Sequence, residues 1–552
     1  MKTISLAAVA LLLPVYGWTQ NAPANPAPYV SKVWVSDQGN GTYKNPVLNA
    51  DYSDPDACRA GQDYYIIASS FDAVPGLPVL HSRDLVNWTL IGHALKRQPP
   101  LDHFAKTQHG NGVWAPAIRY HKNEFYIYYP DPDFGVYMVK ATHPAGPWSE
   151  PVLVESGKGL IDPCPLWDDD GKVYLVHGWA GSRAGIKSII TVKQLSPDGT
   201  KVIDEGAIVY DGHETDPTIE GPKIYKRNGY YYLFAPAGGV PTGWQLVLRS
   251  KNIYGPYERR IVLDQGKTPV NGPHQGAWVD TPPVKGKPQQ DWFLHFQDKE
   301  AYGRVVHLQP MRWINDWPVI GVDPDGDGKG EPVLTYAKPA VGATYPIATP
   351  AESDEFNDLK VGLQWQWQAN PKGTWMTTSK LGFLRLYSWK VPEEAKNLWD
   401  VPNVLMQKLP AEAFTATTKM TFTANPKLEN EKAGLVLMGQ SYASLAIRSR
   451  KDGLELVYGV CRKAVDGKPE AEQVLAKLPN GTIYLRMRMT GGAHCQFSYS
   501  LDGKSYTAAG EPFQAEPGKW IGAKMGLFCT RTTQINDSGF ADFDWFRVEP
   551  NQ

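Results

Sequence analysis

The sequence has few cysteines and, after its first fifteen residues, no long hydrophobic run. Five cysteines in 552 residues, at positions 58, 164, 461, 495 and 529, are too few and too scattered for a disulfide framework. No CxxC or HExxH pattern occurs, which argues against a catalytic zinc site of the usual kind. Because no later apolar run reaches the ~18 residues that a membrane-spanning helix needs, we expect no membrane partner.

The chain also lacks a net charge. Fifty-six Lys and Arg stand against 57 Asp and Glu, which gives a formal net charge of −1 at pH 7. Such a balance provides no field that would draw the chain to phosphate backbones or anionic membranes. We therefore expect no nucleic-acid partner.

The N-terminus has the pattern of a secretory signal peptide. Lys2 precedes a short apolar run from Ile4 to Val15, and this run is too short to cross a bilayer. We predict a signal peptide over residues 1–20, cleaved between Gly17 and Ala24, and a mature protein that is periplasmic or extracellular. No cysteine follows the run, so a bacterial lipid anchor is not expected.

Aromatic residues are abundant, and they recur in a regular pattern. A marker that contains Pro or Gly is followed by a turn and an aromatic run, roughly every 50 to 60 residues. Turns such as Asn228-Gly229 are strong hairpin signals. The five markers are Asp54-Pro55, Trp114-Ala115-Pro116, Asp162-Pro163, Glu220-Gly221-Pro222 and His274-Gln275-Gly276. This period favours a five-bladed β-propeller over residues 40–335, with a β-sandwich as the alternative.

A second domain follows the propeller. Residues 336–352 are rich in Pro, Ala and Gly and are typical of a linker. Apolar and polar residues then alternate in segments such as 418–422 and 483–488, which predicts an antiparallel β-sandwich of the jelly-roll or concanavalin type over residues 353–548. The predicted fold class is therefore all-β.

Three of the five markers carry a carboxyl group, namely Asp54, Asp162 and Glu220. The innermost strands of propeller blades begin near one pole of the axis, so equivalent positions converge there. Asp-Pro and Glu-Gly-Pro are also ordinary turn formers. Converging carboxylates repel one another unless a substrate, a metal or a proton relieves them, so three at matching positions favour a functional site.

These motifs resemble glycoside hydrolase family 43. The resemblance covers nearly the whole mature chain, including the second domain. It rests on residues 51–55, 75–88, 161–163, 219–222, 303–311 and 317–321, and on Phe356, 365–367 and 539–546. One departure is Ser53, which stands where members more often carry Pro.

The resemblance implies a role for each carboxyl group. Asp54 would be the general base that activates water, and Glu220 the general acid that protonates the glycosidic oxygen. Asp162 would orient Glu220 and hold its pKa up. Acetal hydrolysis needs one protonated and one ionised carboxyl group on opposite sides of the sugar. Family members invert the anomeric centre, for which the two groups stand about 6.5–9.5 Å apart.

Four further residues are candidates for substrate contact. Arg304 is similar to the family's pocket arginine, although a surface ion pair is the alternative. Trp114 and Phe71 would wall the sugar subsite, or else belong to the core. His274 is similar to a histidine near the propeller axis that in many members contacts calcium or a calcium ligand, and an ordinary core histidine is the alternative.

Residues 323–331 begin like a calcium loop. Asp323, Asp325, Asp327 and Gly328 fit the start of the pattern, but Leu334 stands where an EF-hand requires Glu. A plain acidic turn is the alternative. We expect no cofactor for the chemistry, and a structural calcium ion is possible.

The resemblance implies an inverting, exo-acting glycoside hydrolase. It would release terminal α-L-arabinofuranose or β-D-xylose from plant hemicellulose or from pectin side chains, with β-1,4-xylosidase as an alternative main activity. A noncatalytic carbohydrate-binding propeller is the hypothesis from another class, and a calcium-dependent adhesion module is a third. The sequence gives no indication of the oligomeric state.

Overall fold

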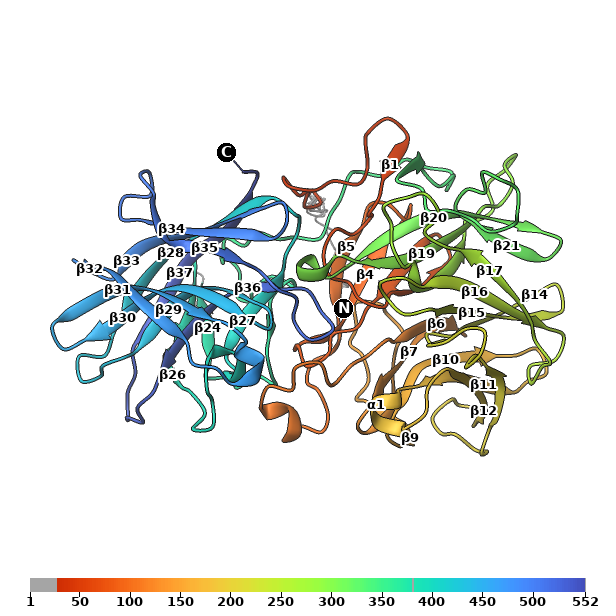
Figure 1. The fold of residues 1–552 in the computed structure, drawn as a ribbon, viewed down its shortest axis with the longest axis horizontal. Coiled ribbons are helices and arrows are strands. Elements are labelled where there is room, and N and C mark those ends of the chain that lie inside the picture. The colour runs from red at the N-terminus through yellow and green to blue at the C-terminus, as the bar shows by residue number, and fades with distance from the viewer. Residues whose placement is uncertain (1–26, 380–381, 552) are drawn as a thin grey trace, which may run out of the picture.

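The computed structural model describes residues 27–379 and 382–551. The chain forms two β-rich bodies that lie side by side, with the N-terminal body on the right of Figure 1 and the C-terminal body on the left. The predicted signal peptide lies outside the described residues.

The N-terminal body is a propeller of five four-stranded antiparallel sheets, as predicted. Each blade is built from consecutive strands, so every blade is local in sequence. The blades are β2 (Asp56–Ala60), β3 (Asp63–Ile67), β4 (Gly76–Ser82) and β5 (Thr89–Leu95); β6 (Ala117–His121), β7 (Glu124–Asp131), β8 (Gly135–Ala141) and β9 (Val152–Ser156); β10 (Leu160–Trp167), β11 (Val173–Trp179), β12 (Ile189–Leu195) and β13 (Ala207–Asp211); β14 (Lys223–Arg227), β15 (Tyr230–Ala237), β16 (Trp244–Ser250) and β17 (Glu258–Leu263); and β18 (His274–Asp280), β19 (Asp291–Asp298), β20 (Arg304–Ile314) and β21 (Trp317–Ile320).

Turn chemistry explains the hairpins. Asn228 and Gly229 have φ values of 50° and 74° and connect β14 to β15. Positive φ at both central residues is what the tight turns of β-hairpins require, and Asn-Gly supplies it with little strain. The aromatic run that follows packs between neighbouring blades.

Side chains close the ring between the first and last blades. Tyr64 and Ile66 of β3 share a buried cluster with Trp292 and Leu294 of β19. At the ends of the domain, β1 (Thr42–Lys44) pairs with β22 (Thr335–Ala337). The start and the end of the propeller are therefore joined by backbone hydrogen bonds as well as by apolar packing.

The C-terminal body is a sandwich of two large antiparallel-rich sheets, as predicted. Leu435, Leu445, Met487 and Phe543 are among the side chains buried between them. One sheet contains β23 (Gln366–Trp367), β26 (Trp389–Lys390), β27 (Val404–Lys408), β29 (Lys432–Met438), β30 (Tyr442–Arg450), β31 (Gly453–Cys461), β32 (Ala471–Leu478) and β36 (Lys524–Arg531). The other contains β24 (Met376–Ser379), β25 (Phe383–Tyr387), β28 (Phe414–Thr423), β33 (Thr482–Thr490), β34 (His494–Ser500), β35 (Thr507–Gln514) and β37 (Phe540–Glu549).

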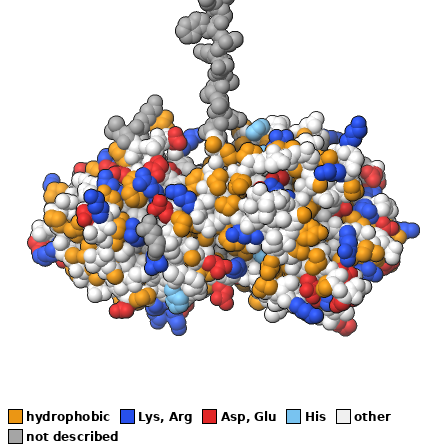
Figure 2. Space-filling view, turned by 90° about the horizontal axis from the view of Figure 1, so that it is seen from above, with side chains coloured by type: hydrophobic (Ala, Val, Ile, Leu, Met, Phe, Trp, Pro, Cys, Tyr) orange, Lys and Arg blue, Asp and Glu red, His pale blue; other side chains and the backbone are white. Residues whose placement is uncertain are grey.

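Helices are short throughout the described residues. They are α1 (Gly181–Ala184) and the 3-10 turns η1 (His103–Ala105), η2 (Glu300–Tyr302), η3 (Leu398–Asp400) and η4 (Ala464–Asp466). None of the described helices has the length and apolarity needed to span a membrane. All five cysteines are buried and free. Acidic and basic side chains are interspersed on the face seen in Figure 2.

Backbone hydrogen bonds fix the two bodies to each other. Val74 of the propeller exchanges two hydrogen bonds with Trp367 of β23, of 3.0 and 2.7 Å. The buried Asn370 side chain accepts from the backbone N–H of Gln98 at 2.8 Å and donates to its carbonyl at 2.8 Å. Because these groups are buried at the interface, water does not compete for them.

We expect Asn370→Ala to weaken the interface between the two bodies. The substitution leaves the buried N–H and C=O of Gln98 without their partners, so the free energy of unfolding should fall by about 2 kcal/mol or more. Urea unfolding followed by circular dichroism measures this. A change below about 0.5 kcal/mol, the usual range for a surface substitution, would contradict the importance of this contact.

Candidate active site

The three predicted carboxyl groups lie at the inner ends of three blades. Asp54 precedes β2, Asp162 lies within β10, and Glu220 precedes β14. Asp54 and Asp162 have φ values of 52° and 57°, a region that is costly for residues other than glycine. The pairing of β10 with β11 shifts register between Ile161 and Cys164. This irregularity turns the Asp162 side chain out of the regular strand alternation.

Asp54 is held by two side chains. It is only 5% exposed. Its Oδ1 accepts a hydrogen bond from Nη1 of Arg304 at 2.7 Å, and its Oδ2 accepts one from Oγ of Ser69 at 2.6 Å. Each oxygen therefore has one fixed donor and still has a lone pair for a further proton.

Asp162 is bound to the segment that carries Glu220. Its Oδ2 accepts a hydrogen bond from the backbone N–H of Gly221 at 2.7 Å. Burial, and next the charge of Glu220, raise the pKa of Asp162 to about 7. Asp54 adds a smaller contribution in the same direction, so the three carboxyl groups act on one another electrostatically.

Glu220 is the most accessible of the three, with its side chain 35% exposed. Its Oε1 lies 3.0 Å from Nε2 of His274, and its backbone N–H donates to the carbonyl of Pro236 at 3.1 Å. His274 is fully buried, and its Nδ1 has no hydrogen-bond partner among the described residues. The structure thus places His274 against Glu220.

Arg304, at the start of β20, is buried and contacts Asp54, so it is not a surface ion pair. Its guanidinium lies 4.8 Å from the ring centre of Phe296. Burial alone would lower the pKa of Arg304, but the carboxylates of Asp54 and Asp298 outweigh it and the pKa is raised. Arg304 therefore provides a permanent positive charge beside the carboxyl groups.

The two candidate aromatic residues lie on joined segments. Phe71 is 2% exposed, and its backbone exchanges hydrogen bonds with Val113 at 2.9 and 3.0 Å. The indole of Trp114 donates to the carbonyl of Gly110 at 2.9 Å. The Trp114 ring faces Trp520 edge to face, with 6.3 Å between ring centres.

Trp520 was not predicted from the sequence. It belongs to the sandwich, is 52% exposed and has a φ of 68°. The only local signal is an aromatic residue between two glycines, Gly518 and Gly522. That pattern is common in loops, so it does not point to a site.

A cavity of about 890 Å³ opens beside Arg304 between the two bodies. Propeller residues line one side and sandwich residues line the other. They include Asn271, Asp298, Glu300 and Arg304 from the propeller, and Glu412, Gln440 and Trp520 from the sandwich. The volume is in the range of small-molecule binding sites.

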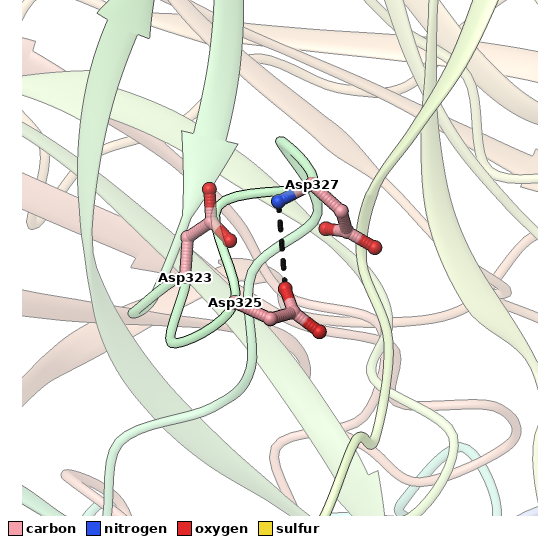
Figure 3. A group of neighbouring side chains, drawn as sticks. All are labelled: Asp323, Asp325 and Asp327. Carbon is pink, nitrogen blue, oxygen red and sulfur yellow. Dashed lines mark hydrogen bonds between the residues drawn. The ribbon is translucent and has the colours of Figure 1, made fainter.

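The acidic loop lies apart from the carboxyl cluster. Asp323, Asp325 and Asp327 form the one group of at least three potential metal ligands found among the described residues (Figure 3). Both Asp323 carboxylate oxygens accept backbone hydrogen bonds, from Gly326 at 2.8 Å and Gly328 at 3.1 Å. These bonds fit an acidic turn.

A calcium ion at His274 stays a prediction from the family resemblance. The one group of metal-ligand side chains found among the described residues is the acidic loop, which does not include His274.

Fold and site together define a class of protein. A five-bladed propeller gathers three carboxyl groups and an arginine at one end of its axis, and the arginine lines a cavity of ligand size. Carboxyl groups with different environments are the groups that glycoside hydrolysis requires. The chain is a glycoside hydrolase.

Comparison with known proteins gives the family. The family model of glycosyl hydrolases family 43 matches residues 43–318, and that of the beta xylosidase C-terminal concanavalin A-like domain matches residues 353–549. The chain belongs to glycoside hydrolase family 43, which confirms the resemblance.

Relatives match along nearly the whole chain. A Xylanibacter ruminicola protein is 43% identical over 91% of this chain and 88% of its own length. A beta-xylosidase of Formosa agariphila is 32% identical over 99% of this chain and 98% of its own length. A non-reducing end alpha-L-arabinofuranosidase of Bacteroides ovatus is 30% identical over 92% of this chain and 94% of its own length.

Solved structures share the two-domain fold. The Bacteroides ovatus xyloglucan PUL protein GH43B is 27% identical, with a TM-score of 0.78 over 92% of this chain and 100% of its own. The family 43 protein BlXynB of Bacillus licheniformis is 25% identical, with a TM-score of 0.76 over 92% of this chain and 100% of its own.

We expect Asp162→Asn to stabilise the protein more at pH 8 than at pH 5. Because the pKa of Asp162 is about 7 in the folded protein and about 3.9 in an unfolded chain, its ionisation opposes folding. The free energy of unfolding of the wild type therefore falls as pH rises from about 4 to about 7. The Asp162→Asn variant lacks this loss, because Asn does not ionise. Urea unfolding at both pH values measures the difference.

Asp502→Asn is the matched control. Backbone N–H groups of Ser505 and Lys504 lower the pKa of Asp502 to about 2, so its contribution is lost only as pH falls below about 4. The difference between this variant and wild type should therefore not change between pH 5 and 8. A constant or shrinking difference for Asp162→Asn would contradict the raised pKa.

Proposed function

We propose that this chain is an inverting, exo-acting hydrolase that releases terminal pentoses from plant hemicellulose or pectin side chains. The observation that carries the proposal is the group of three carboxyl groups with unequal exposure. Arg304 binds Asp54 and lines a cavity between the two bodies. The names of the relatives, beta-xylosidase and alpha-L-arabinofuranosidase, support β-D-xylose and α-L-arabinofuranose as the sugars.

Asp54 is the proposed general base. Its hydrogen bonds to Arg304 and Ser69 fix both oxygens and leave lone pairs to accept a proton from water. The water oxygen then bonds to the anomeric carbon as the glycosidic bond breaks. Asp54 takes the proton that this water loses.

Glu220 is the proposed general acid. It gives its proton to the leaving oxygen, and its exposure suits a group that must reach the leaving sugar. Asp162 accepts a hydrogen bond from the backbone N–H of Gly221, next to Glu220, and interacts electrostatically with the Glu220 carboxyl group. Burial and the charge of Glu220 raise the pKa of Asp162 to about 7, so Asp162 keeps its proton below that pH.

Arg304 and Trp114 are the proposed substrate contacts. Phe71 is 2% exposed and His274 is fully buried, so their proposed role is to support the site from behind. The Arg304 guanidinium has donors besides the Nη1 that binds Asp54, and these suit sugar hydroxyls. His274 contacts Glu220 from the buried side and holds that carboxyl in place.

Exo action is supported by the walls of the cavity. Trp520 and its loop reach from the sandwich toward Trp114 of the propeller. A site enclosed on both sides suits the end of a chain better than its middle. A pocket distinguishes sugars of similar shape poorly, so release of both pentoses by one site is expected.

The noncatalytic alternative has less support. A binding propeller does not require an acid, a base and a third carboxyl group at one pole. All three are present here and act on one another.

We also propose that the protein is exported. Lys2 and the apolar run from Ile4 to Val15 support a signal peptide. A structural calcium ion remains a prediction from the sequence.

Two variants test the acid and the base. Glu220→Ala should lower kcat/KM for xylobiose by about 10²–10⁴-fold, and far less for 4-nitrophenyl β-D-xyloside, because the nitrophenolate leaves with little protonation. Asp54→Ala should lower both, because water must be activated in either case. Steady-state kinetics on these substrates and on 4-nitrophenyl α-L-arabinofuranoside measure this.

Glu258→Ala is the control, since Glu258 is exposed on strand β17. This variant should leave kcat/KM unchanged for xylobiose and for 4-nitrophenyl β-D-xyloside. Equal losses on activated and unactivated substrates for Glu220→Ala would contradict its role as the acid.

Proton NMR of the first product tests inversion and exo action together. Hydrolysis of a β-D-xyloside should yield α-D-xylose first, because water attacks the face opposite the leaving group. Xylohexaose should give xylose and xylopentaose in the early phase. Initial β-D-xylose would contradict inversion, and early fragments of mixed length would contradict exo action.

A further inference from the structure

Asp51 joins the two bodies next to the carboxyl cluster. It is buried, and its Oδ1 accepts hydrogen bonds from Oγ of Ser53 at 2.7 Å and from the backbone N–H of Arg304 at 2.9 Å. Its Oδ2 accepts one from the backbone N–H of Gly522 at 3.1 Å. One carboxylate thus binds the segment of the base, the strand of Arg304 and a sandwich loop.

The turn before Arg304 is embedded in the sandwich. The backbone N–H of Ala493 donates to the Tyr302 hydroxyl at 2.7 Å, and this hydroxyl lies 3.2 Å from the carbonyl of Glu412. The backbone N–H of Ala523 donates to the carbonyl of Ala301 at 2.8 Å. The position of this turn therefore depends on the sandwich.

Two glycines permit this close approach. A Cβ on Gly522 would lie 2.6 Å from the backbone N of Gly303, and a Cβ on Gly303 would lie 2.5 Å from Cβ of Asp51. Gly303 also has a φ of 77°. Gly522 packs on the backbone of Gly303, and Gly303 packs on the side chain of Asp51, so a displacement of the sandwich loop is expected to reach Arg304.

Two lysines of the sandwich, the half-buried Lys408 and the buried Lys524, interact electrostatically with the same carboxylate. Burial lowers the pKa of Lys408 to about 8, and the charge of Asp51 opposes this shift. Burial also lowers the pKa of Lys524, against the charges of Asp72 and Asp51. The interface around Asp51 is therefore electrostatically suited to an ionised carboxylate.

We propose that Asp51 is a positioning residue through which the sandwich sets the place of Arg304, and through Arg304 that of Asp54. The proposal rests on the proposed function, because Arg304 and Asp54 take their roles from it. Asp51 itself does not touch the substrate.

Asp51→Asn tests the proposal. The amide oxygen still accepts from Arg304 and Ser53, whereas the amide NH₂ meets the N–H of Gly522 and cannot accept from it. We expect kcat/KM for 4-nitrophenyl glycosides to fall about 10- to 100-fold, as for loss of a hydrogen bond to a charged group. Gly522→Ala, which pushes the same loop away, should act in the same direction.

Asp72→Asn is the matched control. Asp72 is buried at the same interface, accepts a hydrogen bond from the backbone N–H of Gln108 at 2.9 Å and faces Lys524. It makes no hydrogen bond to Arg304 among those of the described residues. The Asp72→Asn variant should lower the thermal midpoint about as much as Asp51→Asn does, but should change kcat/KM less than twofold.

A double-mutant cycle separates positioning from general stabilisation. In an Arg304→Ala background, Asp51→Asn should lower kcat/KM less than about twofold further, because the effect of Asp51 passes through Arg304. Losses that multiply would overturn the proposal. If wild type releases no pentose, the proposed function fails; the same cycle is then read in the free energy of unfolding, where coupling supports the proposal and additivity overturns it.

Discussion

Mutual repulsion of three carboxyl groups, two of them buried, is the constraint on which the site depends. Low exposure strengthens the repulsion, because water cannot screen it. The chain relieves it in two ways. Arg304 neutralises Asp54 directly, and a proton relieves the pair formed by Asp162 and Glu220. The relief is unequal, because Asp54 has a cation against it whereas the pKa of Asp162 is raised.

The propeller supplies the rigidity that this arrangement requires. Asp54 and Asp162 both adopt left-handed backbone conformations, which cost free energy unless the surroundings hold them. Each precedes or interrupts the first strand of a blade, whose remaining pairs are regular. The hydrogen bonds of four strands in every blade thus fix the strained residues from outside.

Features that depend on neighbouring residues could be predicted from the sequence. The hairpins followed from turns such as Asn228-Gly229, and the convergence of Asp54, Asp162 and Glu220 followed from their matching places in the repeat. Trp520 and the Asp51–Gly522 contact could not be predicted in this way. They join segments separated by several hundred residues, and neither turn chemistry nor periodicity carries information about such pairs. Arg304 was found through the family resemblance alone.

The state of Trp520 bears on why the sandwich is present. An indole that is 52% exposed, on a backbone with a φ of 68°, contributes little burial and costs strain. Packing within the sandwich does not account for it. The same loop is held at Gly522 by Asp51, and Trp520 contacts the edge of Trp114. An exposed aromatic side chain that lines a cavity offers a flat surface on which a sugar ring can stack. The sandwich supplies Trp520, Glu412 and Gln440 to the lining of this cavity, so one wall of the cavity belongs to the second body.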